Sequence, residues 1–208
     1  MANLTCSQII LAGGRSRRLG TLPKCDLVFE GQTLLAHAMA AGQLACHQVV
    51  VGPPDLPVVD GVRLVREDPP FGGPVAGIAA GVRELAAAGC TADWILITAC
   101  DHPHAEAATA ALIANLPELS TTIELVTPTD STGHRQTLFA LYRREALERE
   151  LARHDGGHNL SVRRLIADLA TVEATVDDDL LDDVDDPAAA ARHGINLPRK
   201  GQPHAPRP

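Results

Sequence analysis

The sequence predicts an α/β fold, a single three-layer αβα domain built around a mainly parallel sheet. Short apolar runs alternate along the chain with segments whose apolar residues recur about every 3.6 positions, and this alternation indicates βαβ units. Of the 208 residues, 45% are hydrophobic and 21% are charged, which suits one domain with a substantial core. The first apolar run ends at two glycines, as a buried strand does where it meets a ligand-binding turn.

Strands are predicted where short aliphatic runs are bounded by glycine, proline or polar residues. The first run is apolar throughout, which indicates a strand covered by helices on both faces. The predicted strands are residues 8–12, 49–51, 62–65, 94–98 and 138–142. Because strands and helices alternate, we expect a Rossmann-like arrangement with ligand sites at the carboxyl ends of the strands.

Helices are predicted where apolar residues follow the helical period. Pro74 suits the first turn of the second helix, and Pro187 suits the start of a last one. The predicted helices are residues 33–45, 75–88, 105–116, 144–153 and 160–169. Residues 1–195 are expected to form the one domain, because we find neither an internal repeat nor a linker. Residues 196–208 are rich in proline and basic residues, so we expect a disordered tail.

Composition restricts the partners and the compartment. The formal net charge is −8, which argues against general binding to nucleic acid or to an anionic membrane. The five cysteines form no CxxC pair, so neither a disulfide framework nor a zinc ribbon is expected. We find no export leader and no apolar run long enough to span a membrane, and we expect a cytoplasmic protein.

The segment after the first strand combines bare backbone with positive charge. Gly13 and Gly14 let the backbone approach a ligand closely and turn its N–H groups towards phosphate oxygens. Cations surround the same turn, at Arg15, Arg17, Arg18 and Lys24. The spacing fits neither a P-loop nor a dinucleotide fingerprint. It indicates a polyphosphate site, and the alternative is a solvated basic loop.

Carboxylates follow two further segments. Asp101 comes directly after the strand predicted at 94–98 and could hold Mg²⁺, which prefers oxygen ligands, or could instead cap a helix. Asp183 and Asp185 alternate around Val184, so both would lie on one face of an extended segment, and one of them could complete the metal site. The alternative is a solvated acidic face. A soft-metal cluster among the cysteine and histidines of residues 100–104 is a weaker alternative.

On these motifs the sequence resembles the MobA-like nucleotidyltransferases, in particular the molybdenum cofactor guanylyltransferases. The opening signature is matched by Leu11, Ala12, Gly13, Gly14, Ser16, Arg18, Gly20 and Lys24. Further segments follow in the family's order at residues 67–77, 100–103, 135–142 and 183–187. The resemblance extends over roughly residues 7–195.

The resemblance implies a Mg²⁺-dependent transfer of GMP from GTP to the phosphate of molybdopterin, with release of pyrophosphate. It implies catalytic roles for Lys24, Arg18 and Asp101, with Asp183 or Asp185 as a further metal ligand. Nucleotide binding is implied for Leu11, Ala12, Gly13, Gly14, Lys24 and Asp68. Other cofactor-biosynthesis proteins or molybdoenzymes are implied as transient partners.

Gly14 favours GTP over CTP, because the guanine-specific branch of the family tends to read LAGG. Two related activities stay open, a CTP-dependent molybdopterin enzyme and a sugar-phosphate nucleotidyltransferase. A nucleotide-binding regulatory protein without turnover is a third alternative, although the intact Lys24 and Asp101 argue against it.

Overall fold

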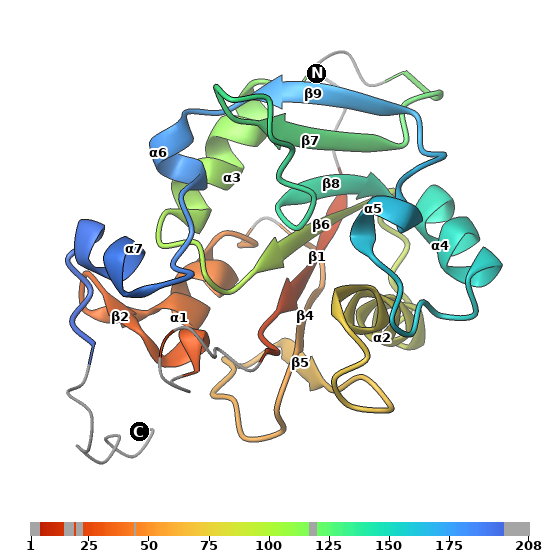
Figure 1. Ribbon diagram of the computed structural model, residues 1–208. Helices are drawn as coiled ribbons and strands as arrows, with labels where there is room; N and C mark the ends of the chain where they lie inside the picture. Colours follow the sequence, from red (N-terminus) through yellow and green to blue (C-terminus); the bar gives the residue numbers. More distant parts are fainter. Residues whose placement is uncertain (1–4, 15–18, 20–22, 44, 117–119, 198–208) are drawn as a thin grey trace.

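A computed structural model describes residues 5–14, 19, 23–43, 45–116 and 120–197. A seven-stranded sheet forms the middle layer, with helices on both of its faces (Figure 1). From edge to edge the strands are β5 (Val62–Val65), β4 (Gln48–Val51), β1 (Cys6–Leu11), β6 (Trp94–Ala99), β8 (Ala140–Arg143), β7 (Leu125–Thr129) and β9 (Thr171–Thr175). The three-layer αβα fold predicted from the sequence is therefore confirmed.

The four strands β5, β4, β1 and β6 run parallel and form the half of the sheet that carries the sequence motifs. Along β1, Ile9 packs with the core on one face and Ile10 with the core on the other, and neither side chain is exposed. Such strands read as continuous apolar runs because helices cover both faces. Leu11 pairs with Ala99, so β1 and β6 end side by side at the carboxyl edge of the sheet.

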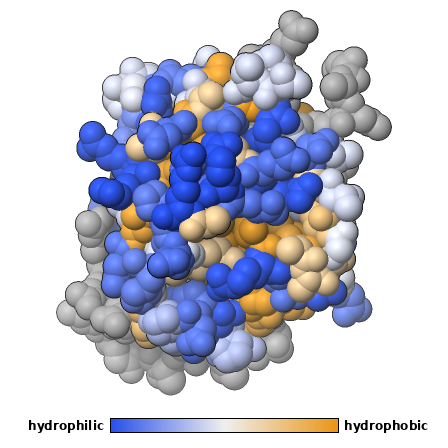
Figure 2. Space-filling model, turned by 90° about the vertical axis from the view of Figure 1, so that its right-hand side faces the viewer, coloured by the Kyte–Doolittle hydropathy of each residue, from blue (hydrophilic) through white to orange (hydrophobic). Residues whose placement is uncertain are grey.

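Helices are divided between the two faces of the sheet. One face carries α1 (Leu34–Ala40), α3 (Ala105–Ala114) and α6 (Asp178–Leu181), and the other carries α2 (Pro74–Ala87), α4 (Arg144–Arg153) and α5 (Val162–Leu165) (Figure 1). The short helix α7 (Pro187–Arg192) follows α6, and its start near Pro187 is confirmed. The face that carries α4 is mainly hydrophilic, with a band of hydrophobic surface across it (Figure 2).

Helix α2 lies unusually close to β1. A Cβ atom on Gly81 would stand 2.7 Å from the Ile9 side chain, a separation that real Cβ atoms do not adopt. Glycine therefore permits a helix-to-sheet approach that any larger residue would push apart. The first turn of α2, with Pro74 at its start, is held beside the carboxyl edge of the sheet as a result.

The half of the sheet beyond β6 differs from the expectation. The strand predicted at 138–142 lies at Ala140–Arg143 and runs antiparallel to β6, and the sequence analysis identified neither β7 nor β9. Pro128 lies within β7, where a proline would normally argue against a strand. It is tolerated because β7 pairs with β8 only at Leu125 and Val126, before the proline. The hairpin of β2 (Val28–Phe29) and β3 (Gln32–Thr33) was also missed.

Three predicted helices are shorter in the structure. The helix predicted at 33–45 covers Leu34–Ala40, with Thr33 as its cap, and turns follow it. The helix predicted at 160–169 is only Val162–Leu165, because later N–H groups reach carbonyls three residues back, as between Leu169 and Ile166, and so form turns. The helix predicted at 105–116 also ends two residues earlier than predicted, at Ala114. Most of the tail predicted at 196–208 lies outside the described residues.

Candidate active site

The turn after β1 opens the carboxyl edge of the sheet. Backbone hydrogen bonds from Cys100 N to Leu11 O (3.1 Å) and from Ala12 N to Val51 O (2.9 Å) hold the ends of β4, β1 and β6 together. Gly14 has a φ of 136°, which favours glycine. A Cβ atom on Gly13 or Gly14 would meet no described atom within 4 Å. The described part of the chain therefore leaves room for a ligand to approach this backbone.

Lys24 lies at the centre of the site. It begins the short 3₁₀ helix Lys24–Asp26, and its Nζ donates to Asp101 Oδ2 at 2.7 Å and to Asp185 Oδ1. Burial alone would lower the pKa of Lys24, but the charge of Asp101 and hydrogen bonds to both carboxylates outweigh it and hold the pKa above its ordinary value. Lys24 is therefore a firmly charged ammonium group.

The acidic segment predicted to face Asp101 does so. Val184 N donates to Asp101 O at 2.9 Å, and the fully buried Val184 side chain anchors the segment between its two aspartates. Burial, and then the negative charges of Asp101 and Asp185, raises the pKa of Asp183 above the ordinary range of aspartate. The fold therefore holds three carboxylates together at a cost in folding free energy.

The three carboxylates fit a divalent cation. Asp101, Asp183 and Asp185 each offer an oxygen, and the three oxygens lie within 4.8 Å of one another. Magnesium takes oxygen ligands, commonly one or two carboxylates together with substrate phosphates. Lys24 supplies one positive charge to this cluster, so a further cation would relieve the remaining repulsion. The donor set is that of a hard metal.

The competing soft-metal site at residues 100–104 does not form. Cys100 is buried beside Cys25, His102 packs edge-on against Phe139 with ring centroids 5.1 Å apart, and His104 packs against Phe29. His102 Nε2 lies 3.9 Å from Asp101 Oδ1, but only Asp101 of this segment belongs to a cluster of possible metal ligands, the one with Asp183 and Asp185. Within the described residues, the oxygen cluster is the metal arrangement at this edge of the sheet.

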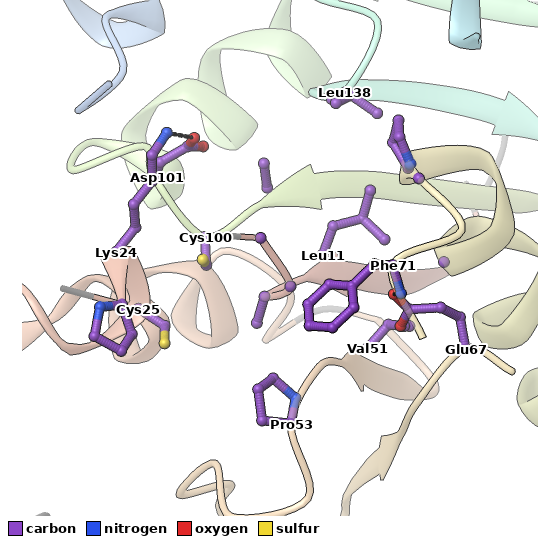
Figure 3. Close-up of a pocket in the computed structure, with 18 of the residues that line it drawn as sticks. Leu11, Lys24, Cys25, Val51, Pro53, Glu67, Phe71, Cys100, Asp101 and Leu138 are labelled. Carbon is purple, nitrogen blue, oxygen red and sulfur yellow. Dashed lines mark hydrogen bonds and ion pairs between the residues drawn. The ribbon is translucent and has the colours of Figure 1, made fainter. Parts of the chain in front are cut away.

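A pocket of about 1060 Å³ extends from Lys24 and Asp101 across the ends of β1 and β4. Figure 3 shows Lys24 and Asp101 on one side, Glu67 and Phe71 on the other, and Leu11 between them. The lining residues are Leu11, Ala12, Gly13, Gly14, Pro23, Lys24, Cys25, Val51, Pro53, Asp55, Glu67, Phe71, Gly73, Pro74, Gly77, Ala99, Cys100, Asp101, Leu138 and Asp185. The charged cluster of Lys24 and Asp101 therefore lies at one end of the cavity, and the aromatic ring of Phe71 lies with the carboxylate of Glu67 at the other.

The far wall of the pocket differs from the expectation at one residue. Asp68, assigned to nucleotide contact from the resemblance, is exposed and absent from the lining, whereas Glu67 lines the pocket and its Oε1 accepts from Phe71 N at 3.0 Å. Asn159 N donates to Gly72 O at 2.8 Å, which brings the segment after α4 beside this wall.

The sequence analysis did not identify several lining residues. Pro53 and Asp55 follow β4, whose parallel pairing with β1 brings its carboxyl end to the same edge. Their position after a predicted strand was the signal that could have found them. Arg18, Arg15 and Arg17 lie outside the described residues.

Comparisons with known proteins agree with this architecture. The MobA-like NTP transferase domain family matches residues 8–174. The molybdenum cofactor guanylyltransferase of Acidiphilium cryptum is 33% identical over 147 residues, 69% of this chain and 71% of that enzyme. The enzyme of the same name from Pseudomonas fluorescens is 37% identical over 119 residues, 55% of this chain, so the chain spans about half (56%) of that relative's length.

Solved structures share the fold at lower identity. Rv0371c from Mycobacterium tuberculosis superimposes with a TM-score of 0.67 at 23% identity, covering 93% of this chain and 98% of that one. The inositol-1-phosphate CTP transferase from T. maritima gives a TM-score of 0.66 at 13% identity, covering 93% and 96%. Rv0371c was also solved in complex with manganese, with a TM-score of 0.64 at 21% identity, covering 91% and 97%.

Proposed function

Because the chain belongs to the MobA-like NTP transferase family, we propose that it is a guanylyltransferase of molybdenum cofactor biosynthesis. It moves GMP from GTP to the phosphate of molybdopterin, forms the guanine dinucleotide cofactor and releases pyrophosphate. The names of its relatives support this choice of nucleotide and acceptor.

The observation that carries the proposal is the contact of Lys24 with Asp101 and Asp185 beside the Gly13–Gly14 turn, at the charged end of the pocket. A nucleoside triphosphate has the complementary shape, with a polyanion at one end and a flat base at the other. Gly13 and Gly14 would let the triphosphate lie against the backbone, with the base and ribose extending past Leu11 and Ala12 towards the wall of Glu67 and Phe71. Asp68 keeps a proposed role at the edge of this wall.

The residues suit phosphoryl chemistry without a nucleophilic side chain. The attacking phosphate monoester is already anionic near neutral pH, so the protein must align two anions and neutralise charge. Lys24 would stabilise the charge that develops on the leaving pyrophosphate, and we assign the same role to Arg18. When bound by Asp101 with Asp183 and Asp185, Mg²⁺ would supply further neutralisation of the phosphate oxygens.

Gly14 and the relatives' names favour GTP, whereas the fold does not discriminate, because a CTP transferase superimposes equally well. A thermal-shift panel of GTP, CTP, ATP and UTP with Mg²⁺ tests the choice. A nucleotide at 100 times its Kd stabilises the folded state by about 2.7 kcal/mol. We expect the largest shift with GTP, and a larger shift with CTP would overturn the choice of base.

Pyrophosphate release on addition of molybdopterin tests turnover and acceptor together. Release that requires both GTP and molybdopterin supports the proposal. Release with a sugar phosphate in place of molybdopterin would reassign the acceptor, and GTP binding without any release would indicate a regulatory protein.

We place the reaction in the cytoplasm, with transient contacts to other cofactor-biosynthesis proteins or molybdoenzymes as the route of delivery. The five cysteines are all free thiols, which suits a reducing compartment. Among the described residues, the longest helices are too short or too polar to traverse a bilayer.

A further inference from the structure

A second group of metal-ligating side chains lies at the opposite, amino edge of the sheet. Cys46 and His47 precede β4, and Cys90 lies between α2 and β6. A sulfur from each cysteine and a ring nitrogen of His47 lie within 4.8 Å of one another. Four residues of β1 separate this edge from Leu11, which is roughly 13 Å at about 3.3 Å per residue, so the group is distinct from the active site.

We propose that Cys46, His47 and Cys90 form a binding site for a soft divalent cation, with Zn²⁺ as the metal that fits it best. Zinc is bound by thiolate sulfur at about 2.3 Å and by imidazole nitrogen at about 2.0 Å, which places two tetrahedral sulfur ligands about 3.8 Å apart. Because the ligand atoms lie within 4.8 Å of one another, the two sulfurs need to approach by no more than about 1 Å to reach this separation.

The local structure explains how adjacent residues can both reach the metal. In an extended strand Cys46 and His47 would point to opposite faces, but Cys46 lies at a bend. Cys46 N donates to Cys6 O at 2.9 Å, and Gln8 N donates to His47 O at 2.9 Å, so the bend is fixed to β1 on both sides. The positions of the ligands therefore follow from the parallel ladder.

Two polar groups in the site suit a bound metal. Nδ1 of His47 is shielded from solvent and has no hydrogen-bond partner among the described residues. The fully buried Ser7 hydroxyl lies 3.2 Å from Cys46 Sγ and 2.9 Å from Cys90 Sγ. A hydroxyl between two sulfurs is well placed to donate to a metal-bound thiolate, as the outer partners of metal ligands do.

The charge balance also fits a divalent cation. Binding would form two Zn–S bonds and one Zn–N bond, while the two thiol protons pass to solvent as the thiols become thiolates. Two thiolates and Zn²⁺ together are neutral, which suits a site that includes the buried Cys90. Cys46 is exposed, so the metal can enter from solvent, and a water molecule can take the fourth position.

The site would join β4 to β6 across β1. Its ligands precede two strands that both pair with β1, so a metal there would hold the middle of the parallel half of the sheet at its amino edge. This is a stabilising role, separate from nucleotide transfer.

Metal binding by the tag-free, reduced full-length protein tests the proposal. We expect one Zn²⁺ per chain by elemental analysis, and with Co²⁺ we expect the near-ultraviolet absorption of thiolate-to-metal charge transfer. The variant Asp101→Asn should keep this absorption, because the carboxylate site contains no sulfur. Absence of Co²⁺–thiolate absorption would overturn the site.

Variants identify the ligands. Cys46→Ala changes an exposed side chain, so folding should be preserved, and it should weaken Zn²⁺ binding by more than about 100-fold, because even outer-partner changes cost about 10- to 100-fold. Ser7→Ala should weaken it by about 10-fold. Cys6→Ala is the matched control, since Cys6 packs with Trp94 in a different core cluster from Cys90 and should leave binding unchanged.

Two results would contradict the proposal. Equal losses in Cys46→Ala and Cys6→Ala would indicate unspecific thiol binding. A Cys46–Cys90 disulfide in freshly reduced and desalted protein, found by mass spectrometry in place of bound zinc, would show that the two sulfurs serve each other and not a metal.

Discussion

The two ends of strand β6 carry opposite kinds of ligand chemistry. After its carboxyl end, Asp101 meets Asp183 and Asp185, which are hard oxygen donors. Before its amino end, Cys90 meets Cys46 and His47, which are soft sulfur and nitrogen donors. Magnesium and zinc prefer these two donor sets respectively, so one sheet would separate the two proposed metals by chemistry as well as by distance.

The carboxylate group and the thiol–imidazole group also differ in their surroundings. Asp101 and Asp185 line a pocket of about 1060 Å³ together with Lys24, so an exchangeable ligand can enter. The thiol group borders the core and is bridged by the Ser7 hydroxyl. The carboxyl edge therefore suits the exchange of substrates, and the amino edge would suit a metal that holds the strands together.

The largest effect should come from Asp101→Asn, which removes the charge of the carboxylate nearest the β1 turn. Because this carboxylate would hold the metal that neutralises the phosphates, kcat/KM for pyrophosphate release should fall by at least about 10³-fold, since loss of a single electrostatic contact already costs about 10²- to 10³-fold. Asp93→Asn is the control, because Asp93 precedes the same strand at its other end. Equal losses of kcat/KM in both variants would contradict the assignment of catalysis to the carboxyl edge.

Lys24→Ala should have the next largest effect. It removes the ammonium group that bridges Asp101 and Asp185, and kcat/KM should fall by about 10²- to 10³-fold at saturating Mg²⁺. The control is Arg63→Ala, which removes a half-exposed cation that pairs with Glu84 away from the pocket. A loss below about threefold in Lys24→Ala would remove this residue from the mechanism.

Much of the carboxyl edge could be predicted from sequence because its signals are local. The Ile9–Ile10 run, the two glycines and Asp101 after Trp94–Ala99 each mark a strand end, and parallel strands bring their carboxyl ends to one edge. The alternation of Asp183 and Asp185 around Val184 also predicted that both aspartates lie on one face of an extended segment. What the sequence could not give is the Val184–Asp101 backbone contact that fixes this segment beside the metal ligands.

The group of possible metal ligands at the amino edge could not be predicted from the sequence, for a physical reason. Cys46 and Cys90 belong to no short motif, and they meet only because β4 and β6 flank β1. The same long-range dependence hid β7, since Pro128 argues against a strand until its neighbours are known. Strand β9 does alternate polar and apolar residues, so its local signal was overlooked. Pairing partners, more than local propensity, decided β7.

The smallest effect should be a gain in stability from Asp183→Asn in the metal-free protein. The raised pKa of Asp183, caused first by burial and then by Asp101 and Asp185, means that its charged form costs more in the folded than in the unfolded state. That cost is fully present above the folded pKa and vanishes below the ordinary pKa near 3.8. At neutral pH, removing this charge should raise Tm, by about 2–4 °C for each 1 kcal/mol relieved in a chain of this size.

Melting curves across pH, with and without Mg²⁺, check this expectation. The advantage of Asp183→Asn should shrink as pH falls through the raised pKa, and Mg²⁺ should reverse it by stabilising the parent protein more than the variant. Asp182→Asn is the control, because Asp182 pairs with Arg192 and not with the metal ligands. If Mg²⁺ stabilises the parent and Asp183→Asn equally, Asp183 is no ligand, and the hard site at this edge consists of Asp101 and Asp185.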